Sequence, residues 1–450
     1  MSSDGPGRSG ISNGRSAHAS HVAEQMRHRE YHPRAIDLPP EFAHAAQLGV
    51  DVAARIDAID QVALRKYRLN RVREQLRSRD VAGALLSDAM NIRYATGTRN
   101  MVLWTLRQAG RYAFIATEGP VVMFEFSTCR HLAEGFETID EIRTGTSTFY
   151  FYAGSRTLEK TRSWAKEIDA LLREYGGSNR RLAVDDLTPM GAAELERQGV
   201  EFVDAHEALE QARCIKSPGE IAAHQLAMDV CDLGIERLRG GLRAGLTENQ
   251  IWSVLQATNI AHDGEFIDCR LLTSGSRTIP WFQECGNRQV SAGEMVAFDT
   301  DMVGPMGALA DISRSYVVPG RSATAAQREL YALAEEQVAH NMALLRPGVS
   351  FHDFADRSWP VPPRFEKNRY MTLVHGVGLC DEWPAVLPAS DQRRDGYDGV
   401  FQENMIVSVE SYLGADDGQE GVKLEQQVLI TPSGAKLFSR IPMANALEIA

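Results

Sequence analysis

Apolar and polar positions follow different rhythms in the two halves of this chain. In the first half, short apolar runs at strand spacing alternate with charged segments at helical spacing, beginning with a charged helix expected at 62–79. This alternation predicts a smaller, mixed α/β domain over residues 46–210. Strands are expected at 81–88, 111–116, 120–126, 181–186 and 200–205, and a turn is expected at 91–97.

The second half begins with I-K-S-P-G-E-I (215–221), which is typical of a helix start. Ser217 can cap the helix, and Glu220 completes a capping box. A second helix is expected from Thr247. Later strands are expected at 266–272, 295–301, 312–318, 405–412 and 422–430, with a helix at 325–345. Helices beside a mostly antiparallel sheet predict an α+β domain over residues 211–450.

Composition narrows the classes of function. The chain has 450 residues, 44% of them apolar, and its net charge of −12 argues against nucleic acid or an anionic membrane as the main partner. No apolar stretch suits a membrane span or a secretory leader. Six cysteines without a C-x-x-C pair predict reduced thiols in the cytoplasm. Residues 1–45, rich in Ser, Gly, Arg and His, are expected to form a mobile arm.

Several expected strands carry an isolated acid among apolar neighbours. These acids are Asp299, Asp301, Asp311, Glu410 and Glu425. A buried carboxylate without a partner costs several kcal/mol or takes up a proton. A salt bridge to Arg314 or Lys423 would suffice for any single acid. Five acids on four strands, together with His375, favour a metal site instead. Strand alternation predicts that Asp299 and Asp301 share one face.

The order of these residues resembles the pita-bread metallopeptidase family, which includes methionine aminopeptidase, aminopeptidase P, prolidase and creatinase. Beside the capped helix, the resemblance is carried by D-I-S-R (311–314), H-G-V-G-L (375–379), V-E-S-Y (409–412) and L-E-Q-Q-V-L-I-T (424–431). N-I-R-Y-A-T-G (91–97) resembles the N-terminal domain of the creatinase and prolidase branch. The resemblance implies a homodimer with two divalent transition-metal ions per chain. The ligands that it implies are Asp299, Asp311, His375, Glu410 and Glu425.

Departures from the family pattern bear on the chemistry. The family's D-x-G is Asp299-Thr300-Asp301 here, so Asp301 can be a sixth ligand. Where the hydrolases of this family place histidines that handle protons and the peptide carbonyl, this chain has Trp281, Met371 and Glu382. A site without those histidines is not expected to be an efficient peptidase.

Aromatic residues are frequent around these changed positions. Trp281, Phe282, Trp359 and Trp383 offer ring faces that suit a small quaternary or sulfonium cation, although an ordinary core position is the better interpretation of each ring taken alone. Together with the changed histidines, they resemble the dimethylsulfoniopropionate (DMSP) lyases of the DddP type. Those pita-bread proteins release dimethyl sulfide and acrylate from a small zwitterionic substrate.

This second resemblance implies roles for two further residues. Asp381 would remove the α proton of the substrate, and Tyr370 would orient the carboxylate or act as an alternative acid or base. Iron is the favoured metal by resemblance. Asp381 could instead cap its loop, and Tyr370 could be a buried aromatic. A binuclear hydrolase of the prolidase or creatinase type and a non-enzymatic interaction module stay open as alternatives.

Overall fold

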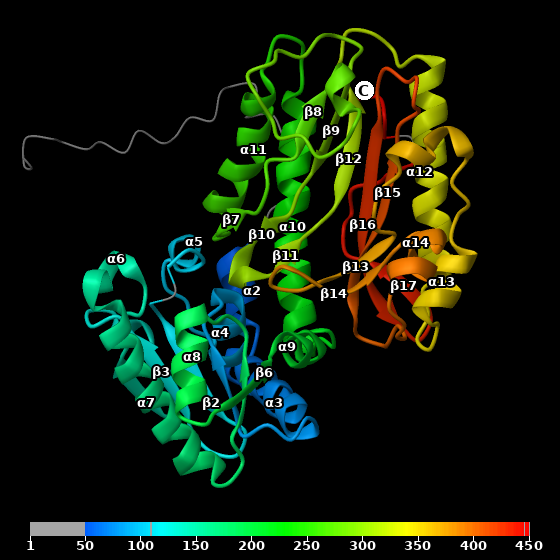
Figure 1. Cartoon of the computed structure of the whole chain (residues 1–450). Helices are drawn as coiled ribbons and strands as arrows, with labels where there is room; N and C mark the ends of the chain where they lie inside the picture. The colour runs from blue at the N-terminus through cyan, green and yellow to red at the C-terminus, as the bar shows by residue number, and fades with distance from the viewer. Residues whose placement is uncertain (1–49, 109, 445, 450) are drawn as a thin grey trace, which may run out of the picture.

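Two domains make up the described part of the chain (Figure 1). The computed structural model describes residues 50–108, 110–444 and 446–449, so the arm expected at 1–45 lies outside them. Both domains combine helices with sheets, and the predicted α+β class is confirmed. Among the described helices, none has the length and apolar character that a membrane span requires.

The N-terminal domain is built around one six-stranded sheet. Its elements are α2 (Val52–Asp57), α3 (Gln61–Ser78), β1 (Gly83–Leu86), α4 (Ala89–Thr96), α5 (Val102–Thr105), β2 (Tyr112–Ala116), β3 (Val121–Glu125), η2 (Arg130–Leu132), β4 (Glu141–Thr144), α6 (Tyr150–Ala153), η3 (Gly154–Arg156), α7 (Thr157–Gly176), β5 (Arg181–Val184), α8 (Pro189–Arg197), β6 (Glu201–Asp204) and α9 (His206–Arg213). The strand order is β4-β3-β2-β1-β5-β6. Leu85 packs with α7 and α8, whereas Ala84 and Leu86 pack with α3 and α9, so helices cover both faces.

The segment 91–97, expected as a turn, is most of helix α4. The helix starts where the Asp88 side chain accepts hydrogen bonds from the backbone of Met90 and Asn91, and it ends at Gly97, whose φ is 83°. All eight residues of α4 are buried. A short helix that is buried on every side, its polar residues included, has no exposed face to give a 3.6-residue rhythm, which is why the pattern did not predict it.

The C-terminal domain contains two long helices followed by short strands and three further helices. Its elements are α10 (Pro218–Gly241), α11 (Glu248–Ala261), β7 (Phe266–Ile267), β8 (Leu272–Ser274), η4 (Gly275–Thr278), β9 (Met295–Asp299), β10 (Met302–Val303), η5 (Pro305–Gly307), β11 (Leu309–Ala310), β12 (Ser313–Val317), α12 (Ala325–Leu344), α13 (Phe351–Arg357), η6 (Pro363–Asn368), β13 (Val374–Val377), β14 (Asp381–Val386), α14 (Ala389–Asp395), β15 (Ile406–Leu413), β16 (Val422–Thr431) and β17 (Gly434–Leu437). The predicted capping box at Ser217 is present, with Glu220 as its second member.

One predicted strand of this domain is wrong. The run 266–272 is divided between β7, which pairs with β10, and β8, which pairs with β9. The chain changes from one sheet to another between them, so a single apolar run serves two partners. The strands of this domain form three sheets, in the orders β11-β10-β7, β12-β9-β8 and β14-β13-β15-β16-β17.

Strand β12 lies beside β16 and joins two of these sheets. Ser315 Oγ donates a hydrogen bond of 2.9 Å to the carbonyl of Lys423, and the Lys423 amide donates one of 3.1 Å to the same hydroxyl. This junction brings the ends of β9 and β12 next to the middle of β15 and β16, where the acids lie.

Candidate metal centre

The six side chains expected as metal ligands lie together in the C-terminal domain. Their ligand atoms form groups in which all members lie within 4.8 Å of one another. The aspartate group is Asp299, Asp301 and Asp311, and the histidine group is His375, Glu410 and Glu425. A third group of Asp311, His375 and Asp381 connects the two.

Strand register brings the acids face to face. Glu410 in β15 is directly opposite Glu425 in β16, and Asp299 at the end of β9 is opposite Ser313 in β12. Ser313 Oγ lies 2.7 Å from both Asp299 Oδ1 and Glu425 Oε2. This hydroxyl therefore links the acid of one sheet to the acid of the other.

His375 directs its Nε2 atom at the acids. Nε2 lies 3.3 Å from Asp311 Oδ2, 3.5 Å from Glu410 Oε1 and 3.6 Å from Glu425 Oε1. The other ring nitrogen, Nδ1, lies 3.1 Å from the carbonyl oxygen of Gly376. Because a carbonyl only accepts hydrogen bonds, Nδ1 carries a proton, and Nε2 is the nitrogen available to a metal.

Lys423 is a fully buried cation inside the acidic cluster. Its Nζ lies 2.6 Å from Glu410 Oε2, 3.1 Å from Glu425 Oε2 and 3.0 Å from Asp299 Oδ2. The glutamate oxygens that face His375 are the Oε1 atoms. Lys423 therefore holds the Oε2 atom of each glutamate, while the Oε1 atom of each stays available to a metal ion.

The acids still exceed the cations around them. Asp311 Oδ1 and Glu425 Oε1 are buried and accept no hydrogen bond from any described residue. Five carboxylates face one ammonium and one imidazole, so the ionised cluster has a net negative charge. Carboxylate oxygens with one imidazole suit hard transition-metal ions such as Fe, Mn or Co. The donor set thus fits a divalent metal centre.

Burial and like charges shift the pKa values in the cluster. Burial, reinforced by the negative charge of Glu425, raises the pKa of Asp299 and of Asp311 well above the usual range. Burial acts in the same direction on Glu425, but the Lys423 ammonium holds the pKa of that carboxyl well below its usual value. Divalent ions favour the ionised form of every one of these acids, so binding would release protons.

Asp301 reaches the cluster through a strained backbone rather than through strand alternation. The strand expected at 295–301 ends at Asp299, and Asp301 has a φ of 33°, in a region that few side chains adopt. The Cys269 thiol donates to Asp301 Oδ2, and the Asp268 amide donates to the Asp301 carbonyl at 3.1 Å. No sequence motif marks Cys269, and the pattern analysis missed it.

Asp381 lies at the solvent edge of the cluster. It opens β14, opposite Val377 in β13, and its Oδ1 is 3.5 Å from His375 Nδ1. Its side chain is 61% exposed. Partial burial and the negative charge of Asp381 raise the pKa of Asp268 to about 6.

Two of the aromatic residues singled out in the sequence lie near Lys423, and a third stacks on one of them. The Trp281 ring packs on Tyr412 at 5.8 Å and lies 6.0 Å from Lys423 Nζ. The Tyr370 ring lies 4.7 Å from the same Nζ and stacks on Phe282 at 5.3 Å. Phe282 is 55% exposed and has a φ of 65°, so an aromatic ring is presented to solvent beside Tyr370.

Trp359 and Trp383 have different surroundings. Both belong to the apolar core around α13, where Trp383 packs on Phe351 at 5.4 Å and stacks on Tyr397 at 6.4 Å. Their expected role as substrate-binding residues is not supported, since the structure does not bring these rings together with Trp281 and its neighbours. For these two, the ordinary core is the better interpretation.

Glu382 is a structural acid rather than a member of the site. Asp381 and Glu382 are consecutive in β14, so their side chains point to opposite faces. Glu382 pairs with Arg213 at 3.2 Å and with Lys216 at 2.9 Å. Burial opposes its ionisation, but these two cations lower its pKa to about 2. Met371, the other changed position, is 62% exposed on the loop after Tyr370.

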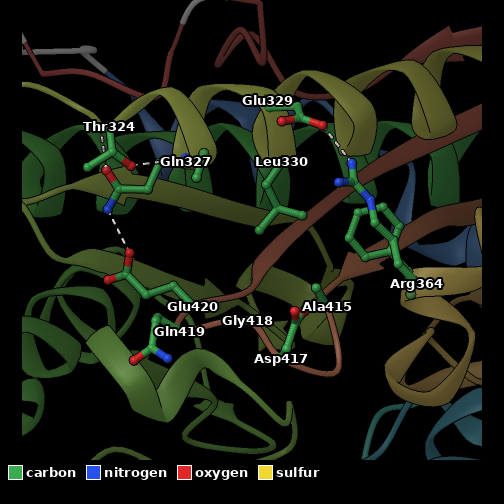
Figure 2. A pocket seen from close by; sticks show the side chains of 12 residues that line it. Thr324, Gln327, Glu329, Leu330, Arg364, Ala415, Asp417, Gly418, Gln419 and Glu420 are labelled. Atoms are coloured by element: carbon green, nitrogen blue, oxygen red, sulfur yellow. Dashed lines mark hydrogen bonds and ion pairs between the residues drawn. The ribbon is translucent and has the colours of Figure 1, made fainter.

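A cavity of about 540 Å³ lies elsewhere, beside α12. Figure 2 shows Gln327 between Thr324 and Glu420 along one side of it, and Glu329 paired with Arg364 at the other. None of its lining residues belongs to the acidic cluster. The titratable groups, rather than this hollow, therefore indicate where chemistry takes place.

Both domains match models of known families. The C-terminal domain matches metallopeptidase family M24 over residues 222–432, and the N-terminal domain matches the creatinase/prolidase N-terminal domain over residues 68–215. The chain is similar to the dimethylsulfoniopropionate lyase DddP of Roseovarius nubinhibens, with 37% identity covering 86% of this chain and 88% of the relative. It is 36% identical to the DddP of Roseobacter denitrificans, covering 88% and 89% of the two chains.

A solved structure shows the same fold. The Xaa-Pro dipeptidase from Bacillus anthracis superposes with a TM-score of 0.67 at 18% identity, covering 85% of this chain and 99% of that one. Together with the family matches, this likeness confirms the expected pairing of a creatinase-like N-terminal domain with a pita-bread catalytic domain.

Proposed function

We propose a function on one premise: this chain belongs to metallopeptidase family M24, and within it to the branch of the DMSP lyases of the DddP type. The chain is a metal-dependent lyase that cleaves DMSP to dimethyl sulfide and acrylate by β-elimination. Family membership implies divalent metal ions, and the groups of ligand atoms described above fit them.

One observation supports elimination over hydrolysis. All the side chains that the resemblance implies as metal ligands are present, yet His375 is the one imidazole that the described residues bring into contact with the acids. Hydrolases of this fold use additional histidines for proton transfer at the peptide bond. Trp281 is buried against Tyr412, and Glu382 is tied to Arg213 and Lys216, so neither position supplies that chemistry.

We infer two metal ions per chain, with iron favoured by the resemblance. The aspartate group would hold one ion and the histidine group the other, with Asp311 shared between them. Bound ions supply positive charge to the substrate carboxylate and so make the neighbouring C–H more acidic.

Asp381 is the base in this proposal. Its carboxylate takes the proton from the carbon next to the substrate carboxylate, and the electron pair of that C–H bond becomes the new C=C bond. The C–S bond breaks, and sulfur leaves with the bonding pair as neutral dimethyl sulfide, so acrylate remains. Because the Asp381 side chain is 61% exposed, the proton can pass on to solvent.

Aromatic rings and one phenol orient the substrate. The exposed face of Phe282 suits the sulfonium cation, and Trp281 completes the aromatic wall. Tyr370 stacks on Phe282 and lies beside Lys423, which puts its phenol next to the carboxylate end of the substrate. The geometry that supports these roles is the proximity of the Trp281 and Tyr370 rings to Lys423, which contacts the acids, and the stacking of Phe282 on Tyr370.

We also propose a cytoplasmic homodimer. The described cysteines are all free, which suits a reducing compartment. Tyr150, Phe151 and Tyr152 are 77%, 69% and 56% exposed, and such an apolar patch favours association with a second copy. Light scattering that finds only the subunit mass of 49.8 kDa would contradict the dimer.

The experiment that tests the proposed function compares two substrates on one metal-loaded preparation. DMSP should be cleaved with a kcat in the ordinary enzyme range of about 1–1000 per second, and Gly-Pro should be hydrolysed far more slowly if at all. A kcat/KM for Gly-Pro that exceeds the value for DMSP would overturn the lyase and favour the binuclear hydrolase.

A further inference from the structure

Helix α4, formed by the N-I-R-Y-A-T-G segment, connects the small domain to the metal-binding domain. Most of its polar side chains serve the small domain: Asn91 bonds to Asp185, and the Tyr94 hydroxyl donates to the Ala212 carbonyl at 2.8 Å. Arg93 is different, because its buried guanidinium crosses to Glu265 of the C-terminal domain with two hydrogen bonds of 2.8 and 2.6 Å. These two hydrogen bonds from one guanidinium to one carboxylate fix the orientation of the two groups as well as pairing their charges.

The Arg93 guanidinium also lies directly against Gly307. Gly307 has a φ of 72° in the turn between β10 and β11, and a Cβ at this position would overlap Arg93 Cζ. The opposite side of the same hairpin packs on α10, where a Cβ at Gly304 would lie 2.8 Å from the Ala227 Cβ. The hairpin is therefore held between α10 and Arg93, at the side of the C-terminal domain that faces the small domain (Figure 1).

This hairpin links two of the expected metal ligands. Asp301 immediately precedes β10, and Asp311 immediately follows β11. Strands β10 and β11 contain two residues each, and the long helix that packs on them is α10. The position of the turn therefore affects both carboxylates, and Asp311 is also held by Gln427, whose Oε1 accepts a hydrogen bond of 2.8 Å from the Asp311 amide.

Glu265, the partner of Arg93, immediately precedes β7, which pairs with β10. The Glu265 amide donates to the Val303 carbonyl at 2.8 Å, and the two residues that follow β7, Asp268 and Cys269, both bond to Asp301. Arg93 thus contacts both segments next to Asp301: Glu265, which precedes β7, and Gly307, in the turn that follows β10. A ligand with a φ of 33° needs such support from its surroundings.

We propose that Arg93 is a positioning residue for the metal centre, through which the small domain holds the aspartate group in its binding geometry. The proposal rests on the proposed function only in taking the acidic cluster as a metal centre. It does not depend on which substrate that centre serves. It assigns a role in the catalytic domain to a residue of the N-terminal segment 91–97.

The test measures bound metal rather than activity alone. Arg93→Met removes the guanidinium and its two hydrogen bonds to Glu265, and Gly307→Ala puts a methyl group where the guanidinium lies. Both should weaken binding of one of the two metal equivalents by about 10-fold or more, as is usual when a residue behind a ligand is lost. The equivalent bound by the histidine group should keep its affinity. Arg93→Lys keeps the charge but cannot make both hydrogen bonds, so its metal affinity should lie between those of the wild type and Arg93→Met.

Two control variants separate this role from general stability. Arg99→Met removes an exposed contact to the same Glu265, and Arg111→Met breaks a buried ion pair of 2.6 Å with Glu125 inside the small domain. Both should keep wild-type metal affinity, and Arg111→Met should lower only the melting temperature. Metal content by mass spectrometry, affinity by competition with a chelating dye, and melting temperature give the three readouts.

The outcomes are distinct. Wild-type metal affinity in both Arg93→Met and Gly307→Ala, or an equal loss in Arg111→Met, would overturn the positioning role. If Arg93→Met does not fold, Arg93→Lys and Gly307→Ala decide the matter by the same criteria. Failure of the wild-type protein to release dimethyl sulfide would overturn the proposed substrate, while the metal measurements would still test Arg93.

Discussion

Replacing Lys423 with methionine should destabilise the metal-stripped protein far more than the metal-loaded one. Methionine keeps most of the length of the side chain but removes the ammonium that contacts Asp299, Glu410 and Glu425 at 2.6–3.1 Å. In the stripped protein, these buried acids would then lose their common cation. In the loaded protein, the divalent ions continue to neutralise them.

The magnitude follows from burial. Removing one partner of a buried ion pair costs about 3–5 kcal/mol, and Lys423 is fully buried with three acidic partners. In a domain of this size each 1 kcal/mol shifts the melting temperature by about 2–4 °C, so a decrease of about 6–20 °C is expected without metal. With metal bound, the decrease should be about half as large or less.

Thermal unfolding of both variants, with chelator and with metal, is the assay. Lys216→Met is the matched control, because Lys216 is equally buried and pairs with Glu382 at 2.9 Å, without contacting the acidic cluster. The control should lower the melting temperature by the same amount in both conditions. Equal losses for Lys423→Met with and without metal would refute the idea that Lys423 and the metal ions neutralise the same acids.

Three further outcomes are expected. Asp381→Asn should keep its metal and lose kcat by about 100 to 10,000-fold, because an amide cannot accept the proton; near wild-type kcat would move the base role to Tyr370. His375→Ala should lose about one bound metal per chain, measured by mass spectrometry, since its Nε2 is the imidazole nitrogen that faces the acids; an unchanged metal content would exclude His375 as a ligand. Glu382, whose pKa is lowered from 4.5 to about 2, contributes stability that is complete above pH 4.5 and is lost as the pH falls toward 2. Glu382→Gln should therefore flatten the acid limb of the stability curve over that window, and an unchanged limb would contradict the assignment of its ion pairs.

Much of the fold could be predicted from sequence, because its long elements have regular patterns. The capped helix at Ser217 and the strands with alternating or apolar runs are present as expected. Elements that depend on tertiary contacts were missed. Helix α4 is buried on all sides, and the run at 266–272 changes partner between two sheets, so neither has a one-dimensional signature.

Within the candidate site, the types and order of the residues indicated which acids lie close together. The direction in which each side chain points could not be predicted from the sequence. Strand alternation correctly predicted that Asp301 lies with Asp299. The reason was wrong, because Asp301 follows the strand and reaches the cluster through its own left-handed backbone conformation. Alternation also separates Glu382 from Asp381, which composition could not show. Trp359 and Trp383 satisfied the same compositional argument as Trp281, and only packing distinguishes them.

The central claim is that the acidic cluster binds divalent metal and that this metal serves elimination from DMSP. The most direct test is the amount of dimethyl sulfide in the headspace and of acrylate in solution after DMSP is added to the purified protein, before metal removal, after it, and after ferrous iron is restored. The account predicts equal amounts of the two products, loss of both on chelation, and their return with iron. A protein with its metal sites filled that releases no dimethyl sulfide, or one that releases it equally well after complete metal removal, would contradict the account.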